Sequence, residues 1–286
     1  MIRRATDQWR LAADAQSAEW LGLTAIVTGA SGGIGEEIAV QLAGSGARVV
    51  IAARRQDELA RVAARCRDAG ALGPNVLVVP CDVTDRAQCE ALVGAAVGRY
   101  GGLDALINNA GQGMWGRADE VTDLSVYETM LRVNYLSAVW LTLAALPHLK
   151  QTGGRVVTVG SVSGKTGVPL RSGYSAAKHA LTGFMDCLRI ELDGSGVSVT
   201  MVHPGWVSTG SQARNLGPDG VMLGTMPVKP VGGQTAAECA TMLLAAGAAR
   251  KRDVMPDLRS KLALWLKLVR PEMVDRMTAR AIRGQR

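Results

Sequence analysis

Four closely spaced glycines behind a short apolar run constrain the fold more than any other stretch of this chain. Residues 23–27 are apolar or β-branched and lead into Thr28-Gly29-Ala30-Ser31-Gly32-Gly33-Ile34-Gly35, after which apolar residues recur at helical spacing. This order predicts a strand, a tight turn and a helix. Such glycines let the backbone approach a ligand, and the helix N-terminus offers free N–H groups to a pyrophosphate. Because the spacing is G-x-x-x-G-x-G rather than G-x-G-x-x-G, an ordinary glycine-rich connection is the alternative.

Strand-like and helical runs alternate along the rest of the chain. Strands are expected at residues 48–53, 75–80, 104–108, 155–160 and 197–203, and helices at residues 56–68, 86–99, 124–150 and 174–192. The alternation predicts an α/β fold, namely a Rossmann-type doubly wound parallel sheet with helices on both faces. Ligands bind at the carboxyl ends of strands in such sheets, so residues that follow separate strands can share one site.

Tyr174 and Lys178 are four residues apart and therefore lie on the same face of the last expected helix. An ammonium group beside a phenol stabilises the tyrosinate and lowers the phenol's pKa from about 10 towards neutrality. A tyrosine of this kind can exchange a proton with a substrate carbonyl or hydroxyl. The motif is short enough to arise by chance, so its meaning depends on the residues that accompany it.

The accompanying motifs make the chain resemble the classical short-chain dehydrogenase/reductase (SDR) family from about residue 21 to 209, and more loosely to about residue 256. The glycine turn resembles the family's cofactor turn, and Asn108-Asn109-Ala110-Gly111 resembles its motif after the fourth strand. The resemblance implies the following cofactor-binding residues: Gly29, Ser31, Gly33, Ile34, Gly35, Arg54, Arg55, Asp82, Val83, Asn109, Ala110, Gly111, Tyr174, Lys178, Pro204, Gly205, Val207 and Thr209.

The same resemblance implies a catalytic tetrad of Asn134, Ser161, Tyr174 and Lys178. Tyr174 is expected to protonate the carbonyl oxygen as hydride arrives, and to take the proton back during oxidation. Lys178 is expected to lower the pKa of the tyrosine and to hold the nicotinamide ribose. Ser161 is expected to donate a hydrogen bond to the substrate oxygen, and Asn134 to hold a water that relays protons to Lys178.

The end of the second strand indicates which cofactor is used. Folds specific for NAD place an acid about 20 residues after the glycine turn, where it binds the ribose 2′-hydroxyl. Here Ala53 stands in that place and Arg54-Arg55 follow. Guanidinium groups bind a 2′-phosphate with paired hydrogen bonds, so NADP(H) is expected in preference to NAD(H). Many relatives that use NADP also carry a basic residue inside the glycine turn, where this chain has Ser31-Gly32.

The expected reaction is the interconversion of a carbonyl and an alcohol on a hydrophobic small molecule. The loops expected to face the site are mostly apolar, and they comprise residues 112–115, 168–170 and Trp206. Residues 210–230 are rich in Gly and Pro and are expected to form a mobile lid. The alternative is a regulatory or scaffold protein of the same fold without turnover. A serine hydrolase is excluded because Gly160-Ser161-Val162-Ser163-Gly164 does not match G-x-S-x-G.

Composition and charge set the expected domains and location. The organisation expected is an N-terminal helical extension at residues 1–20, the SDR domain at 21–256 and a basic amphipathic helical extension at 257–286. No secretory signal or membrane-spanning helix is expected, and five cysteines without C-x-x-C pairing indicate a cytoplasmic protein without a metal site.

The C-terminal extension carries the excess charge of the protein. Residues 250–286 hold 11 Lys/Arg and 4 Asp/Glu, so the net charge of this segment is +7. The net charge of the whole chain is also +7. Leu258, Leu262, Trp265, Leu266 and Val269 form an apolar stripe at helical spacing. We expect this stripe to pack on the protein body or on a second subunit, with peripheral membrane contact as the alternative. Nucleic-acid binding is not expected. The family resemblance implies a homodimer or homotetramer formed through the long helices at residues 124–150 and 174–192.

Overall fold

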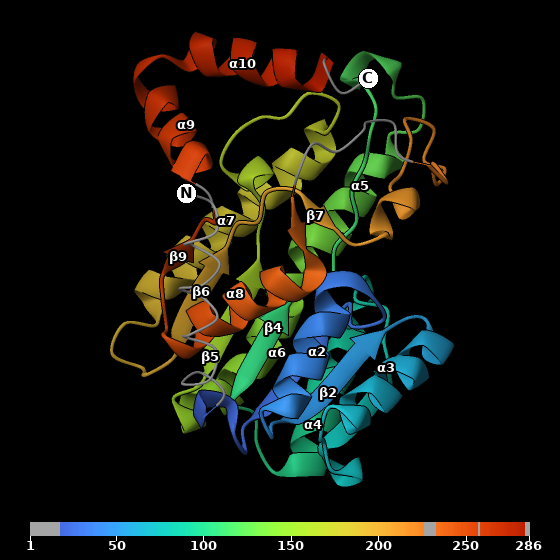
Figure 1. The fold of residues 1–286 in the computed structure, drawn as a ribbon, viewed down its shortest axis with the longest axis vertical. Coiled ribbons are helices and arrows are strands. Elements are labelled where there is room, and N and C mark those ends of the chain that lie inside the picture. Colours follow the sequence, from blue (N-terminus) through green and yellow to red (C-terminus); the bar gives the residue numbers. More distant parts are fainter. Residues whose placement is uncertain (1–17, 226–232, 257, 284–286) are drawn as a thin grey trace.

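A seven-stranded parallel sheet forms the centre of the protein in a computed structural model that describes residues 18–225, 233–256 and 258–283 (Figure 1). The strand order is β3-β2-β1-β4-β5-β6-β9. Strands β1 to β3 are added towards one edge of the sheet and β4, β5, β6 and β9 towards the other, so the topological switch point lies between β1 and β4. The predicted Rossmann-type fold is confirmed. The strands are β1 (Thr24–Thr28), β2 (Arg48–Ala53), β3 (Val76–Pro80), β4 (Ala105–Asn108), β5 (Arg155–Val159), β6 (Ser198–Val202) and β9 (Asp253–Val254).

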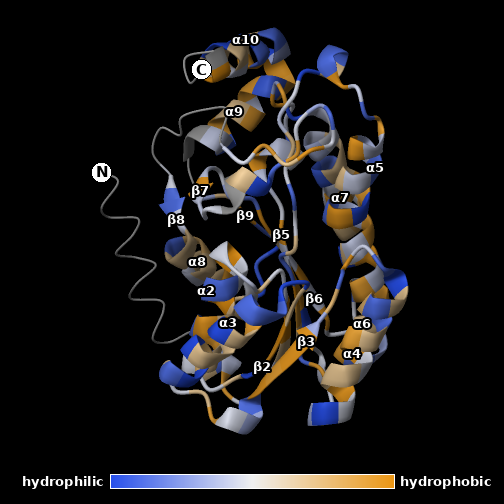
Figure 2. Cartoon of the chain, turned by 90° about the vertical axis from the view of Figure 1, so that its right-hand side faces the viewer, coloured by the Kyte–Doolittle hydropathy of each residue, from blue (hydrophilic) through white to orange (hydrophobic). Residues whose placement is uncertain are grey.

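Helices cover both faces of the sheet because successive strand residues point to opposite sides. In β1, Ala25 and Val27 join a core with helices α2, α3 and α8, whereas Ile26 joins a core with α4, α6 and α7. Figure 2 shows the hydrophobic strands between the two helical layers. The helices are α2 (Gly33–Gly44), α3 (Gln56–Asp68), α4 (Arg86–Tyr100), α5 (Ser125–Leu131), α6 (Ser137–Thr152), α7 (Ser172–Glu191), α8 (Ala236–Ala248), α9 (Leu258–Val269) and α10 (Pro271–Arg283).

The helix expected at residues 124–150 is not uniform. It is divided into α5, a π-helical turn (Arg132–Leu136) and α6, and α6 continues past Pro147 to Thr152. Ser125–Thr152 is long and apolar enough to cross a membrane by length and composition, contrary to the expectation of no such segment. Its inner side packs against α4, α7 and β4, as the core helix of a globular fold does.

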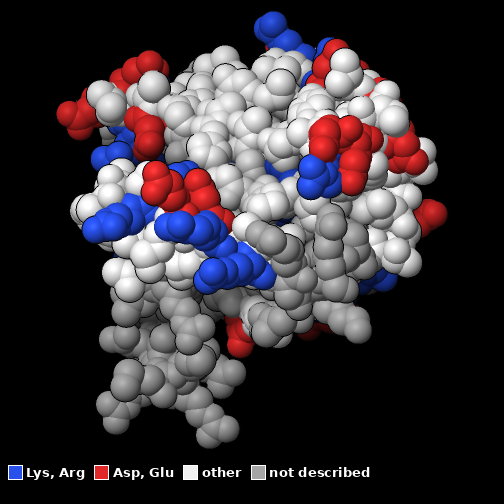
Figure 3. Space-filling model, turned by 90° about the horizontal axis from the view of Figure 1, so that it is seen from above, with Lys and Arg blue, Asp and Glu red and all other residues white. Residues whose placement is uncertain are grey.

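The two ends of the described chain lie outside the sheet. Of the N-terminal extension expected at residues 1–20, all but the last three residues lie outside the described residues. Ala18–Trp20 forms a 3-10 turn with the Trp20 side chain buried under the Arg155 guanidinium. At the other end, α9 and α10 pack against each other at the top of the molecule (Figure 1). Figure 3 looks at that end and shows separate clusters of charged side chains with broad uncharged areas between them.

Candidate active site

One cavity of about 630 Å³ lies at the carboxyl ends of the strands and collects nearly all the predicted site residues. Of the residues expected to bind the cofactor or act in catalysis, only Gly35 does not line it. A side chain at position 35 would collide with the carbonyl of Gly29 and the side chain of Asn109. The absence of a side chain at Gly35 therefore serves the close approach of helix and turn rather than direct contact with a ligand.

The glycine turn is fixed by hydrogen bonds to the loop after β4. The Thr28 hydroxyl donates to the carbonyl of Ile107 (3.2 Å) and accepts from the backbone N–H groups of Asn109 and Ala110 (3.0 and 3.1 Å). Gly29 has a φ of 64°, and a Cβ there would lie 2.9 Å from the Ala110 Cα. The two loops therefore form a narrow cradle at the start of α2, which fits the backbone-lined pyrophosphate site of a dinucleotide.

The adenine end of the cavity is basic. The Arg55 guanidinium donates to the carbonyl and hydroxyl of Ser31 (2.9 and 3.1 Å), which places it across the glycine turn. Arg54 and Arg214 line the same cavity. Burial lowers the pKa of Arg214, and the charges of Arg55 and Arg54 lower it further. Glu36, below the turn, is neutralised by ion pairs with two arginines of α3, Arg61 and Arg65.

Tyr174 and Lys178 lie together in the first two turns of α7. The Lys178 Nζ atom donates to the carbonyl of Val159 (2.9 Å) and lies 5.8 Å from the centre of the Tyr174 ring. Burial raises the pKa of the Tyr174 phenol, but the charges of Lys178 and Arg171, together with hydrogen bonds to Ser161 and Arg171, bring the pKa below its ordinary value. Burial lowers the pKa of Lys178. This arrangement suits a tyrosine that exchanges protons.

Asn134 is held inside the π-helical turn, a local irregularity that is frequent at functional sites. Its Nδ2 atom donates to the carbonyls of Gln112 (2.9 Å) and Met130 (3.0 Å). A Cβ on Gly111 would lie 3.0 Å from the Asn134 Oδ1 atom and 3.8 Å from the Lys178 Nζ atom. Both polar atoms therefore face the same small space, where a water can bridge them.

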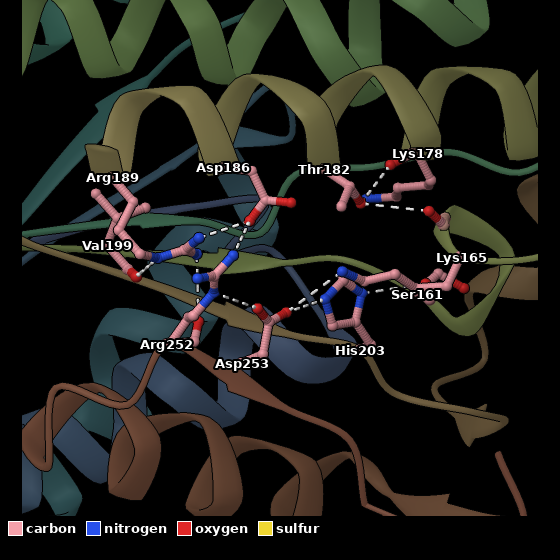
Figure 4. A network of polar contacts seen from close by, with 11 residues as sticks. Ser161, Lys165, Lys178, Thr182, Asp186, Arg189, Val199, His203, Arg252 and Asp253 are labelled. Carbon is pink, nitrogen blue, oxygen red and sulfur yellow. Dashed lines mark hydrogen bonds and ion pairs between the residues drawn. The ribbon is translucent and has the colours of Figure 1, made fainter. Parts of the chain in front are cut away.

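Ser161 follows β5 and is positioned by a polar network that reaches the edge of the sheet. Its hydroxyl accepts from the Ser163 N–H (3.1 Å), and Ser161 lines the cavity beside Tyr174. Behind it, His203 Nδ1 lies 3.3 Å from the Ser161 carbonyl, and His203 Nε2 lies 2.8 Å from Asp253 of β9 (Figure 4). Sequence reasoning assigned no role to His203 and did not predict β9.

Arg171 is a residue of the site that the sequence analysis did not select. It immediately precedes α7, lines the cavity and packs with its guanidinium carbon 4.1 Å from the centre of the Tyr174 ring and 4.9 Å from that of Trp115. Its Nε atom is buried without a hydrogen-bond partner in the described structure. The available signal was its position three residues before Tyr174, on the same helix face.

The substrate side agrees only partly with the loops expected from the sequence. Gln112, Gly113, Trp115 and Trp206 line the cavity, whereas Met114 is buried in a separate apolar cluster. Residues 168–170 do not contribute to the lining. The segment expected as a lid contributes Arg214, Asn215 and Met222. Its described part is attached to the body, for example by the hydrogen bond from the Thr122 N–H to the Pro218 carbonyl (2.9 Å), and residues 226–230 lie outside the described residues.

The described residues contain no group of His, Cys, Asp or Glu side chains that could hold a metal ion, and their five cysteines are all free thiols. The chemistry available in the cavity is therefore that of Tyr174, Lys178, Ser161 and Asn134 next to a dinucleotide cradle.

A family model described as short chain dehydrogenase matches residues 23–217. The chain belongs to the short-chain dehydrogenase/reductase family. It is accordingly an oxidoreductase with a nicotinamide cofactor.

Relatives and solved structures agree with this membership. A dehydrogenase/reductase SDR family protein 7-like protein of Anopheles gambiae is 35% identical over 88% of this chain and 80% of its own length. The structure of an SDR from Burkholderia phymatum in complex with NAD has a TM-score of 0.77 and 26% identity, covering 89% of this chain and 96% of its own. A variant of actinorhodin polyketide ketoreductase with NADPH has a TM-score of 0.68 and 31% identity, covering 82% and 95%.

Proposed function

We propose that this SDR enzyme uses NADP(H) to interconvert a carbonyl and an alcohol on a hydrophobic small molecule, as a carbonyl reductase. The observation that carries the proposal is Tyr174 beside the buried Lys178, with Ser161 at the wall of the same cavity as the dinucleotide cradle. The bound nicotinamide supplies or accepts the hydride. The residues of the chain bind and orient the substrate and move the proton.

In reduction, the Ser161 hydroxyl donates a hydrogen bond to the carbonyl oxygen and the Tyr174 phenol protonates that oxygen. A preorganised donor of this kind contributes about 3 kcal/mol to the transition state. The Lys178 charge stabilises the tyrosinate that remains. Asn134 holds the water that returns a proton through Lys178. In oxidation the tyrosinate removes the hydroxyl proton, and the same residues act in the reverse order.

The preference for NADP(H) rests on the charge of the adenine end. Ala53 occupies the position where an acid would bind a 2′-hydroxyl, and the nearby Glu36 is already paired with two arginines. Arg54, Arg55 and Arg214 together offer paired N–H donors to a 2′-phosphate. The solved relatives carry NAD in one case and NADPH in another, so the family alone does not decide the cofactor.

The hydrophobic character of the proposed substrate is supported by Trp115, Trp206 and Met222 in the cavity wall. The proposal extends to a homodimer or homotetramer in the cytoplasm, on the resemblance to classical members of the family.

Turnover by the Tyr174→Phe variant tests the proposal. Oxidation of NADPH and NADH is followed against a panel of aliphatic and aromatic ketones and aldehydes. The variant should lose about 10³-fold in kcat because the proton donor is missing, with an unchanged Kd for cofactor. Tyr100→Phe, remote from the cavity, is the matched control. Native-like turnover by Tyr174→Phe would refute the mechanism, and cofactor binding without turnover of any carbonyl would favour the regulatory or scaffold alternative.

A further inference from the structure

Arg171 is a half-buried cation that forms no ion pair with a described acid. Its guanidinium carbon lies 4.9 Å from the centre of the Trp115 ring and 4.1 Å from that of Tyr174, and its Nε atom is buried without a hydrogen-bond partner in the described structure. Among the described residues that line the cavity, Asp82 is the only acid, and it follows β3 at the adenine end. A cation that loses hydration without a carboxylate partner is costly, and aromatic faces compensate it only in part.

The position of Arg171 in the chain adds to this cost. Arg171 is the N-cap residue of α7, where the partial positive charge of the helix end disfavours a cation. It makes no side-chain capping bond there. The same helix end favours an anion.

Neighbouring residues make room for the guanidinium at the cavity wall. A Cβ on Gly113 would lie 3.0 Å from the Arg171 Nη2 atom and 2.6 Å from the Asn215 Oδ1 atom. The side chain therefore depends on a glycine opposite it. Burial lowers the pKa of Arg171, and the charge on Tyr174 opposes that change.

We propose that Arg171 binds a carboxylate of the substrate. The inference rests on the proposed function, because it defines the substrate class of the same site: ketones and alcohols with an apolar chain and a carboxylate close to the reacting carbon. The guanidinium carbon is 4.1 Å from the Tyr174 ring centre, so the carboxylate lies within a few bonds of the carbonyl that Tyr174 protonates. Arginine presents paired N–H donors that match a carboxylate.

Matched substrates test the proposal without interference from effects on Tyr174. Initial rates are measured for 2-oxooctanoate and 2-octanone, and for 4-oxooctanoate and 4-octanone, with NADPH and with NADH. The ratio of kcat/KM for the acid to that for the ketone cancels any change common to both. Arg171→Met should lower this ratio on the order of 100-fold, and Arg171→Lys should lower it less because the charge remains. Arg117→Met, an exposed arginine paired with Asp119, should leave the ratio unchanged.

Calorimetry with octanoate, in the presence of cofactor, gives a readout that needs no turnover. The native protein should bind octanoate, and Arg171→Met should not. An equal ratio of rates in the native and Met proteins, or equal octanoate binding, would overturn the proposal. Equal loss of acid and ketone reduction would also overturn it, since Arg171 would then act only on Tyr174. If no ketone is reduced but octanoate binding depends on Arg171, the proposed function fails and the anion site stands.

Discussion

The catalytic cavity and the C-terminal helix pair depart from the usual distribution of residues in opposite directions. In the cavity, Lys178 is 4% exposed and Arg171 lies against two aromatic rings, so positive charges are placed inside the protein. In α9, Trp265 is 71% exposed and Leu262 is 65% exposed, so large apolar groups are placed outside it.

The buried charges of the cavity and the exposed apolar groups of α9 each carry a free-energy cost that the folded chain alone does not offset. Buried charges lose hydration unless an opposite charge compensates them, and exposed apolar groups lose the gain from burial. Leu262, Trp265 and Val269 of the α9 stripe are exposed and do not pack on the described body, contrary to the expectation for this part of the stripe, whereas Leu266 is half-buried. Val274 of α10 is buried and Lys267 donates to the Thr166 hydroxyl (3.2 Å). The extension is thus attached, and part of its apolar stripe is not covered. We infer that the cavity is completed by small molecules and the helix pair by a second subunit or a membrane surface.

Removal of the buried charge of Lys178 should have the largest effect. Lys178→Met should lower kcat on the order of 10³-fold and weaken cofactor binding, because both the tyrosinate and the ribose lose their partner. The pKa of Tyr174 should rise, so alcohol oxidation in the variant should require a higher pH than in the native enzyme. Steady-state rates across pH 6–11 measure this shift, with the exposed Lys150→Met as control. A native pH profile in Lys178→Met would show that the pair does not tune the phenol.

The basic end of the cavity should have the next largest effect. Arg54→Asp should reverse the cofactor preference and change the ratio of the NADPH and NADH dissociation constants about 100-fold, because a carboxylate repels the 2′-phosphate and accepts from the 2′-hydroxyl. Arg214→Met should lower the NADPH affinity less. Titration of protein fluorescence gives both constants, with Arg67→Met on the exposed side of α3 as control. Equal native affinities for the two cofactors would contradict the proposed preference.

The His203–Asp253 contact should give an effect on stability. A hydrogen bond with His203 lowers the pKa of Asp253 to about 2, against the opposing effect of burial. A carboxyl with a depressed pKa stabilises the fold above its unfolded pKa of about 3.9, and this contribution is lost as pH falls from about 4 to 2. Urea unfolding of Asp253→Asn should show about 1–2 kcal/mol less pH dependence in this window than the native protein. Asp275→Asn, exposed on α10, should behave like the native protein. If the free energy of unfolding changed equally with pH in the native protein and both variants, the Asp253 carboxylate would contribute nothing to stability.

Changes to the exposed stripe should have the smallest effect on catalysis. Leu262→Gln combined with Trp265→Gln should leave kcat/KM within about twofold, because neither residue lines the cavity. The double variant should instead have a lower mass by light scattering or sediment less with anionic liposomes. Truncation after Met255 should alter solubility or the oligomer in the same assays. If mass, solubility and liposome binding all remain native, neither surface is covered in solution.

The sequence by itself determined the elements whose signal is local. The apolar runs and helical periodicity placed β2 and α3 at their observed bounds. The glycine turn and the Tyr174–Lys178 pair were identified by local spacing, whereas Asn134 and Ser161 were assigned by the resemblance to the family. Such features depend on backbone geometry and on neighbours three or four residues away. They therefore remain readable in a single chain.

Only the tertiary structure decided the features that depend on distant neighbours and on access to water. The π-helical turn around Asn134, the contact of His203 with Asp253 50 residues later, and the contact of Arg171 with the Trp115 ring have no local signal in the sequence. The exposure of Trp265 is of the same kind, because the stripe on α9 has the same pattern whether it is covered or not. Sequence spacing fixes which side chains share a face of an element. The packing of the elements fixes which of those faces are shielded from water. It therefore decides where a charged side chain carries a free-energy cost that a bound ligand can offset.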